Sequence, residues 1–178
     1  MNVRCLRLLV IVVIAVVVSS CGPHTSIIGS TSVSLDEVRV VEGVPWNAGF
    51  PGLKPIVIGS RAELNVYIEY LDGYTESGYD PSRCCPQPLI APLRNDSTNF
   101  YDYNIIVFPR EEFYGNVEYS VQTPVRRGGE VVIRIDRIEP EGYLYMISQH
   151  VFAYRVSKSI DAVVFDFEGE LTRFENSE

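Results

Sequence analysis

The side chains that most often perform catalysis are few along this chain, and none lies in a recognised catalytic motif. The two histidines are His24, near the N-terminus, and His150, between two apolar runs. Neither stands in a GxSxG, HExxH or similar context, which would place a nucleophile or a metal beside a base. The sequence also has no glycine-rich phosphate loop before a helix and no EF-hand loop. We therefore expect no cofactor and no enzymatic activity.

Three acids in one polar stretch have the chemistry of a calcium site without its specific spacing. Asp72, Glu76 and Asp80 recur every fourth residue, and hard carboxylate oxygens suit Ca²⁺. The same spacing is common among acids that are solvated on a loop, and this is the interpretation we favour. Paired carboxylates for glycoside hydrolysis can be drawn from any chain with 23 acids, so they do not discriminate. We predict no metal site.

Cys84 and Cys85 are adjacent, and three bonding states of this pair remain open. Neighbouring Cα atoms are about 3.8 Å apart across a trans peptide, below the usual disulfide range, so a bond between them would be strained. Pro86 and Pro88 suit the tight turn that such a bond needs, and a vicinal disulfide is the preferred state. Two free thiols or bonds to another chain are the alternatives. A zinc site is disfavoured because there is no CxxC spacing and both histidines are distant.

The first 21 residues have the pattern of an export signal. Arg4 and Arg7 make a positive start, and residues 8–18 are an unbroken apolar run. The run ends in Val18-Ser19-Ser20-Cys21. This exit resembles the lipobox of bacterial lipoproteins. The resemblance implies that residues 1–20 are removed and that Cys21 carries lipid, such as palmitate, as a membrane anchor.

An apolar run of eleven residues is too short to cross a bilayer, which takes about twenty. We therefore favour a removed signal over an uncleaved membrane-spanning helix, with a secretory signal cut elsewhere as the next alternative. In Gram-negative lipoproteins, Asp after the cysteine retains the protein at the inner membrane. Gly22 occupies that position, so the resemblance implies the outer membrane in a Gram-negative host. The cell envelope is oxidising, which favours a bond between the adjacent cysteines.

Removal of the signal would also change the charge and length of the chain. It takes away two arginines and no acids, which leaves 13 basic against 23 acidic residues, a net charge of −10. Such a balance argues against nucleic acid as a partner and offers no polybasic patch for anionic lipid. The remaining 158 residues suffice for one domain. We expect a lipid-anchored tether over residues 21–34, whose last nine residues reach at most about 30 Å when extended, and a domain over 35–176.

Alternation of apolar and polar residues predicts a domain built from short strands. It is clearest over residues 64–70, 131–136 and 163–171, where Leu171 shares a face with Val163. Further strands are predicted at 33–41, 55–58, 103–108, 116–122, 143–148 and 151–157. His150 then falls at a hairpin. We predict an all-β fold, a single antiparallel β-sandwich of the immunoglobulin-like type, with a small closed barrel as the alternative. No sustained helical stripe is predicted, only a single turn at 111–114.

A long stretch over residues 72–102 has no predicted strand or helix. It carries Tyr74, Tyr79 and Tyr101, and tyrosine offers large contact area at low entropy cost, as in a recognition loop. We favour the simpler interpretation of a crossover tied down by proline and packed tyrosine. Its Leu-Ile-Ala run at 89–91 either packs on the domain or forms an edge strand between prolines.

A shorter loop over residues 42–54 carries Trp46 and Phe50. Aromatic residues in a loop could form a platform for a sugar or a peptide. They also commonly cover the end of a sandwich core, and we favour this second role.

Three functions remain open on the sequence alone. The first is a non-enzymatic binding or scaffold module of the cell envelope. The second is an accessory subunit of an envelope assembly or export complex, which would bind through an exposed strand edge. The third is an enzyme acting on envelope glycan through an unrecognised site. An unpaired edge with an apolar patch would favour the subunit, and a pocket with convergent acids or His150 would favour the enzyme.

Overall fold

A computed structural model describes residues 31–34, 36–44, 53–76, 87–114, 117–139, 141–142 and 145–176. All structural statements below refer to this part of the chain. Several residues singled out from the sequence lie outside it: Cys21, His24, Trp46, Phe50, Tyr79, Asp80, Cys84 and Cys85.

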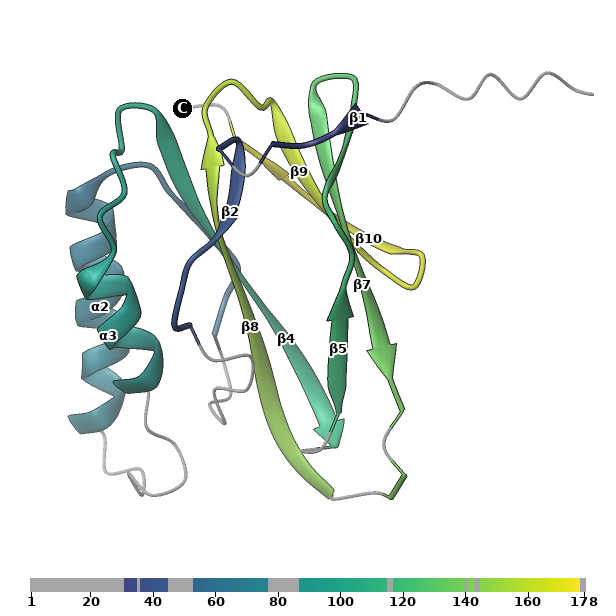
Figure 1. Ribbon diagram of the computed structural model, residues 1–178. Helices are drawn as coiled ribbons and strands as arrows, with labels where there is room; N and C mark the ends of the chain where they lie inside the picture. The colour runs from purple at the N-terminus through teal and green to yellow at the C-terminus, as the bar shows by residue number, and fades with distance from the viewer. Residues whose placement is uncertain are drawn as a thin grey trace, which may run out of the picture.

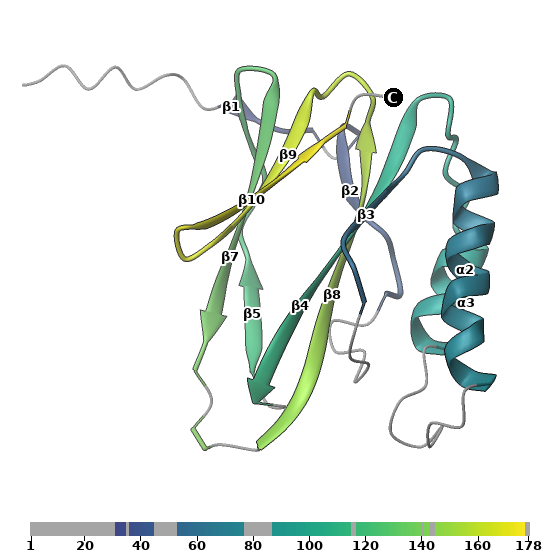
Figure 2. The same ribbon diagram turned by 180° about the vertical axis from the view of Figure 1, so that it is seen from behind.

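The described chain forms three layers (Figure 1). The outer sheet has the order β1 (Thr31–Ser32), β6 (Val125–Arg127), β7 (Glu130–Ile138), β9 (Ala162–Phe167) and β10 (Glu170–Glu175), and β5 (Glu118–Val121) also pairs with β7. The middle sheet has the order β2 (Val38–Val40), β8 (Tyr145–Ser157), β4 (Tyr103–Tyr114) and β3 (Ile56–Ile58). Two helices, α2 (Arg61–Glu76) and α3 (Gln87–Asn95), cover its other face (Figure 2).

The predicted β-sandwich is confirmed, because the two sheets pack face to face and neither closes into a barrel within the described residues. One strand pair departs from the predicted antiparallel pattern. β7 and β9 run parallel, with Val131 opposite Val163. All the other strand pairs among the described residues are antiparallel.

The middle sheet is covered on both faces, which explains the continuous apolar runs in its two long strands. In β4, Ile106 and Phe108 pack in the core shared with the outer sheet, whereas Ile105 and Val107 pack against the helices. Strand β8 repeats this division, with Phe152 and Tyr154 on one side and Val151 and Ala153 on the other. Two separate cores therefore flank a single sheet.

The strand predicted over residues 64–70 is wrong, because these residues lie in α2. The Ser60 hydroxyl accepts a hydrogen bond from the Glu63 amide at 3.2 Å, as an N-cap does. The Glu63 carboxylate accepts one from the Gly59 amide at 2.6 Å, which is close to a capping box. The buried residues of the helix recur at helical spacing: Leu64, Tyr67, Ile68 and Leu71.

The stretch over residues 72–102, predicted to lack regular structure, contains the end of α2 and all of α3. Leu89, Ile90 and Leu93 of α3 are buried in the helix-side core, so the Leu-Ile-Ala run packs on the domain and is not an edge strand. An ion pair of 3.0 Å between Arg94 and Asp72 joins the two helices. Within the described chain, neither helix is long and apolar enough to be a membrane span.

Three smaller predictions also fail where strands continue or end differently. Residues 111–114 extend β4 rather than forming a helical turn. The two strands predicted at 143–148 and 151–157 belong to one strand, β8, so His150 lies within a strand and not at a hairpin. Leu171 lies beyond a tight turn, in β10, where its side chain is 66% exposed instead of sharing the buried face of β9.

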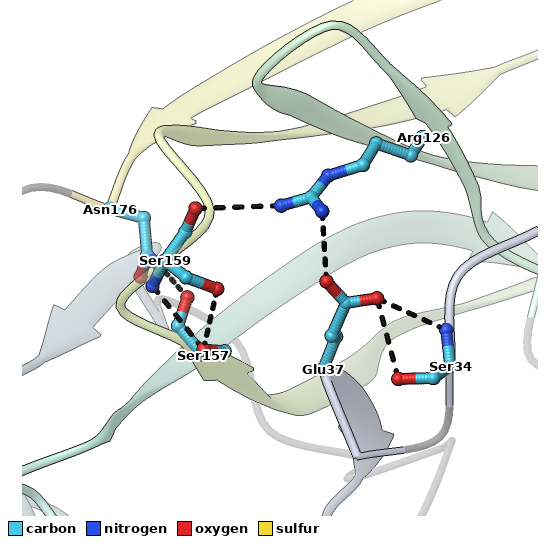
Figure 3. Close-up of polar contacts among 6 residues, drawn as sticks. All are labelled: Ser34, Glu37, Arg126, Ser157, Ser159 and Asn176. Atoms are coloured by element: carbon cyan, nitrogen blue, oxygen red, sulfur yellow. Dashed lines mark hydrogen bonds and ion pairs between the residues drawn. The ribbon is translucent and has the colours of Figure 1, made fainter. Parts of the chain in front are cut away.

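The first described residues are fastened to the end of the sandwich (Figure 3). Thr31 and Ser32, which lie within the predicted tether, pair with β6. The Glu37 carboxylate then accepts hydrogen bonds from Ser34 and from Arg126 at 3.3 and 2.9 Å. The chain therefore joins the sandwich a few residues earlier than the predicted domain boundary.

Candidate binding groove beside strand β3

An open groove of about 670 Å³ lies between α2 and the β3 end of the middle sheet. Figure 2 shows that the chain passes from β3 directly to the start of α2, which runs along the helix side of the middle sheet. Most of its wall is apolar and consists of Pro55, Ile56, Ala62, Val66, Tyr67 and Tyr70. The wall also contains one basic residue, Lys54, and one acidic residue, Glu63. Two apolar side chains of this wall are unusually exposed, Val66 at 65% and Tyr70 at 42%. An exposed apolar patch of this kind commonly marks a site of interaction.

Tyr67 places a polar atom in this apolar wall. Its side chain is 5% exposed, and its hydroxyl has no hydrogen-bond partner among the described residues. The ring stacks on Tyr70, with 6.1 Å between the centroids. Burial, and then the charge of Tyr70, raises the pKa of the Tyr67 phenol well above 10.0, so it stays protonated and can donate. Buried polar atoms nearly always have a partner, so the unused donor of this hydroxyl is an unusual feature beside the groove.

Strand β3 is an edge of the middle sheet. It pairs with β4 on one side, and no described strand pairs with its other side. Its three residues, Ile56 to Ile58, carry no charge. The edge strand β10 of the outer sheet is different, because it carries Glu170, Arg173 and Glu175. Charged side chains on an edge strand discourage pairing with another chain, and β3 lacks this protection.

The turn between β3 and α2 sets the shape of the groove. Because Glu63 holds the Gly59 amide, the chain reverses directly after β3 and α2 runs back beside it. The carboxylate of Glu63 is thereby already occupied. Lys54 forms no ion pair with any described residue, so the uncompensated charge at the groove is positive, on a chain of net charge −8.

A second polar cluster lies inside the sandwich and includes His150. The Tyr119 hydroxyl donates to Glu112, and Arg137 lies 3.4 Å from the same carboxylate. The His150 ring meets the edge of Tyr119 at 4.9 Å. Glu112 and His150 are 8% and 3% exposed. The cluster thus brings together a carboxylate, a phenol and an imidazole. These side chains are buried, and the carboxylate is paired with Arg137. The cluster is therefore better suited to stabilise the sandwich than to contact a substrate.

A second open pocket of about 490 Å³ lies between β2 and α3. On its wall, Arg155 of β8 donates to Asp96 at 2.9 Å and to Thr98 at 2.7 Å. Burial acts to raise the pKa of Asp96, but the hydrogen bonds from Thr98 and Arg155 outweigh it and hold the pKa below its ordinary value. The charges on this wall balance each other, so the arrangement fastens the loop after α3 to the middle sheet.

Of the tyrosines that could form a recognition surface, Tyr101 alone has a described side chain. Tyr101 is 86% exposed in the loop after α3, and Arg61, at the first residue of α2, lies over the neighbouring Phe100 ring. Tyr74 belongs to α2, thirteen residues after Arg61, which is about 20 Å along a helix. Its side chain is outside the described structure, as are Trp46, Phe50 and Tyr79.

Of the three acids considered for a calcium site, Asp72 alone has a described side chain. Asp72 contacts Arg94, as described above, and the side chains of Glu76 and Asp80 lie outside the described structure. Among the described residues, no three His, Cys, Asp or Glu side chains are grouped as metal ligands.

Sequence reasoning missed the groove because it placed residues 64–70 in a strand. The signal that could have found it is the Ser60–Glu63 capping pair, followed by apolar residues at helical spacing. That spacing leaves Val66 and Tyr70 off the buried face of the helix. Apolar residues that a helix leaves exposed side by side indicate a contact surface.

The comparisons with known proteins returned no match. No protein-family model matches the chain, and neither a curated protein nor a solved structure does.

Proposed function

We propose that this chain is a lipid-anchored protein of the cell envelope that binds another envelope protein and performs no catalysis. The export signal and the Val-Ser-Ser-Cys exit at Cys21 support the anchor. The observation that carries the binding role is the apolar groove beside the unpaired edge of β3. Of the two binding roles that the sequence left open, this groove favours an accessory subunit over a general scaffold. In a Gram-negative host the location would be the outer membrane.

The chemistry of the groove favours a protein partner over a glycan. Sites for small polar ligands combine an enclosed cavity with several convergent polar groups. This groove is open and mainly apolar, and its polar groups are the hydroxyls of Tyr67 and Tyr70, Lys54 and an already occupied Glu63. A protein segment can bury apolar side chains against Val66 and Tyr70 and at the same time use the edge of β3.

The anchor is tested by labelling cells with a fatty-acid analogue. The wild-type chain should incorporate the label, and Cys21→Ser should not. If the mature form of the Cys21→Ser variant still carries label, the assignment of the anchor is wrong.

The binding surface is tested by photo-crosslinking in cells. A photoreactive amino acid replaces Val66 in the groove or, as a matched control, Leu171 on the outer sheet. The two side chains are almost equally exposed, at 65% and 66%. We expect a discrete crosslinked product from position 66 and none from position 171. Equal or absent crosslinking at the two positions would contradict a partner in the groove.

A further inference from the structure

We infer that the partner enters the groove as an extended strand that pairs with β3, carries apolar side chains toward α2 and has an acidic residue near Lys54. This inference rests on the proposed function and specifies the class of partner. It depends on three features of the described residues: the unpaired edge of β3, the arrangement of the groove beside it, and the uncompensated charge of Lys54.

The edge of β3 favours a strand over a helix. Along any strand the N–H and C=O groups of alternate residues point to opposite sides, so some of those in β3 face away from β4. Only an extended chain can pair with them in a ladder, because a helix bonds its own backbone groups. An added strand would lie about 4.8 Å from β3. The backbone edge and the groove would then be occupied together.

The position of the groove predicts the pattern of the partner. Ile56 and Ile58 face the helix-side core, and Val57 faces the core between the sheets. In an added strand, every second side chain would therefore point to the helix side, where Val66 and Tyr70 form the wall. These side chains should be apolar. The Tyr67 hydroxyl, which has no partner among the described residues, would donate to an oxygen atom of the same strand.

The charge of the groove predicts an acidic residue at one end of the partner. Lys54 is exposed and forms no ion pair with a described residue, as noted above, and it precedes β3 by two residues. A carboxylate beside it would be attracted on contact. The pair is at the rim, so it should influence partner choice and salt dependence more than total affinity.

A second copy of the chain fits these requirements less well. Antiparallel pairing of two β3 strands about Val57 would place Ser60 opposite Lys54, because the two positions are equally distant from 57. It would therefore supply no acid there. It would also bring together two chains that each carry a net charge of −10 once residues 1–20 are removed. A different protein with an acidic, alternating segment is the better occupant.

The inference is tested by selecting twelve-residue peptides from a random display library on the full wild-type chain in detergent. Selected peptides should alternate apolar and polar residues and carry Asp or Glu near one end. Their affinity should fall about tenfold or more with Val66→Asp, which puts a charge in the apolar wall, and should be unchanged with the control Leu171→Asp. Lys54→Glu should weaken acidic peptides, and replacing the peptide acid by Lys should restore binding to that variant.

Several outcomes would overturn the inference. Peptides with apolar residues at helical spacing would show that a helix binds, and equal loss with Val66→Asp and Leu171→Asp would place binding elsewhere. Dimerisation of the wild-type chain that Val66→Asp abolishes would identify a second copy as the occupant. A crosslink at position 66 combined with helical peptides would leave the proposed function standing and refute the strand alone. Absence of that crosslink would refute the proposed function itself.

Discussion

Replacing Tyr67 by phenylalanine should stabilise the fold while weakening the binding of a partner. The Tyr67 hydroxyl is buried and has no hydrogen-bond partner among the described residues. The folded state therefore loses the hydration of this hydroxyl without gaining a protein hydrogen bond. Phenylalanine keeps the ring, and thus its contacts with Tyr70 and the core, and removes only the unsatisfied atom.

The expected magnitude follows from the cost of burying an unsatisfied polar group, which is about 1–3 kcal/mol. Because Tyr67 lines an open groove, we take the lower end of this range and expect the free energy of unfolding to rise by about 1 kcal/mol. For a domain of this size, 1 kcal/mol corresponds to a shift of about 2–4 °C in the unfolding temperature.

Tyr119→Phe is the matched control, because it makes the same chemical change at a similarly buried tyrosine. The two side chains are 5% and 8% exposed. The Tyr119 hydroxyl, however, donates to the carboxylate of Glu112, and a hydrogen bond to a charged group contributes about 1.5–3 kcal/mol. We expect Tyr119→Phe to lower the free energy of unfolding by about 2 kcal/mol, opposite in sign to Tyr67→Phe.

Urea unfolding of the full chain in detergent, followed by circular dichroism, measures both variants. The slope against urea should remain that of the wild type, so that a shift of the midpoint reports stability alone. If Tyr67→Phe destabilises the chain as much as Tyr119→Phe, the Tyr67 hydroxyl has a partner in the folded state, and the reasoning fails. If Tyr67→Phe stabilises the chain and also weakens the selected peptides, the hydroxyl acts in binding.

Three further predictions concern stability and its dependence on pH. Burial raises the pKa of Tyr154 from 10.0 to about 12, so this phenol loses its proton at a lower pH in the unfolded chain than in the folded one. Its contribution to the free energy of unfolding should therefore fall by about 1.4 kcal/mol per pH unit from pH 10 to 12. A Tyr154→Phe variant whose free energy of unfolding falls as steeply over this range would contradict the prediction. The lowered pKa of Asp96 means that its stabilisation is present above its ordinary pKa of 3.8 and is lost as the pH falls through the lower folded value. Asp96→Asn weakens hydrogen bonds to a charged group and should therefore lower the free energy of unfolding by about 2 kcal/mol at pH 7. It should also show a flatter acid limb in urea titrations, and an unchanged acid limb would count against this. Leu71→Ala, in the helix-side core, should lower the free energy of unfolding by about 2–5 kcal/mol. Val66→Ala should change it by less than about 0.5 kcal/mol. A larger loss with Val66→Ala than with Leu71→Ala would indicate that residues 64–70 form a strand.

Strands with one solvated face could be predicted from the sequence. In β7 the buried residues alternate with Arg134 and Asp136, so the period of two is directly visible. The turn before β7 contains the pair Gly128-Gly129, and Gly128 adopts a positive φ of 65°, which glycine tolerates. The sandwich followed from these local signals.

The helix α2 was missed because two of its core residues satisfy both periods. Leu64 and Ile68 are four residues apart, which is one turn of a helix and also an even number of strand steps. Only Tyr67 and Leu71 distinguish the two patterns, and both are buried here. The continuous strand β8 was divided in two for a related reason, since His150 was interpreted as a polar break although it lies buried within the strand.

The sequence by itself determined the strand segments with a solvated face, the turns between them and the acidic balance of the chain, because each of these depends on neighbouring residues. It also carries the predicted export signal and the expected anchor at Cys21. Only the tertiary structure decided that helices cover the middle sheet and that β3 is its edge, because the order β2-β8-β4-β3 depends on pairing between residues far apart in the chain. The groove exists only through this order. No local pattern could therefore place Lys54, Val66 and Tyr67 on one surface beside an unpaired strand.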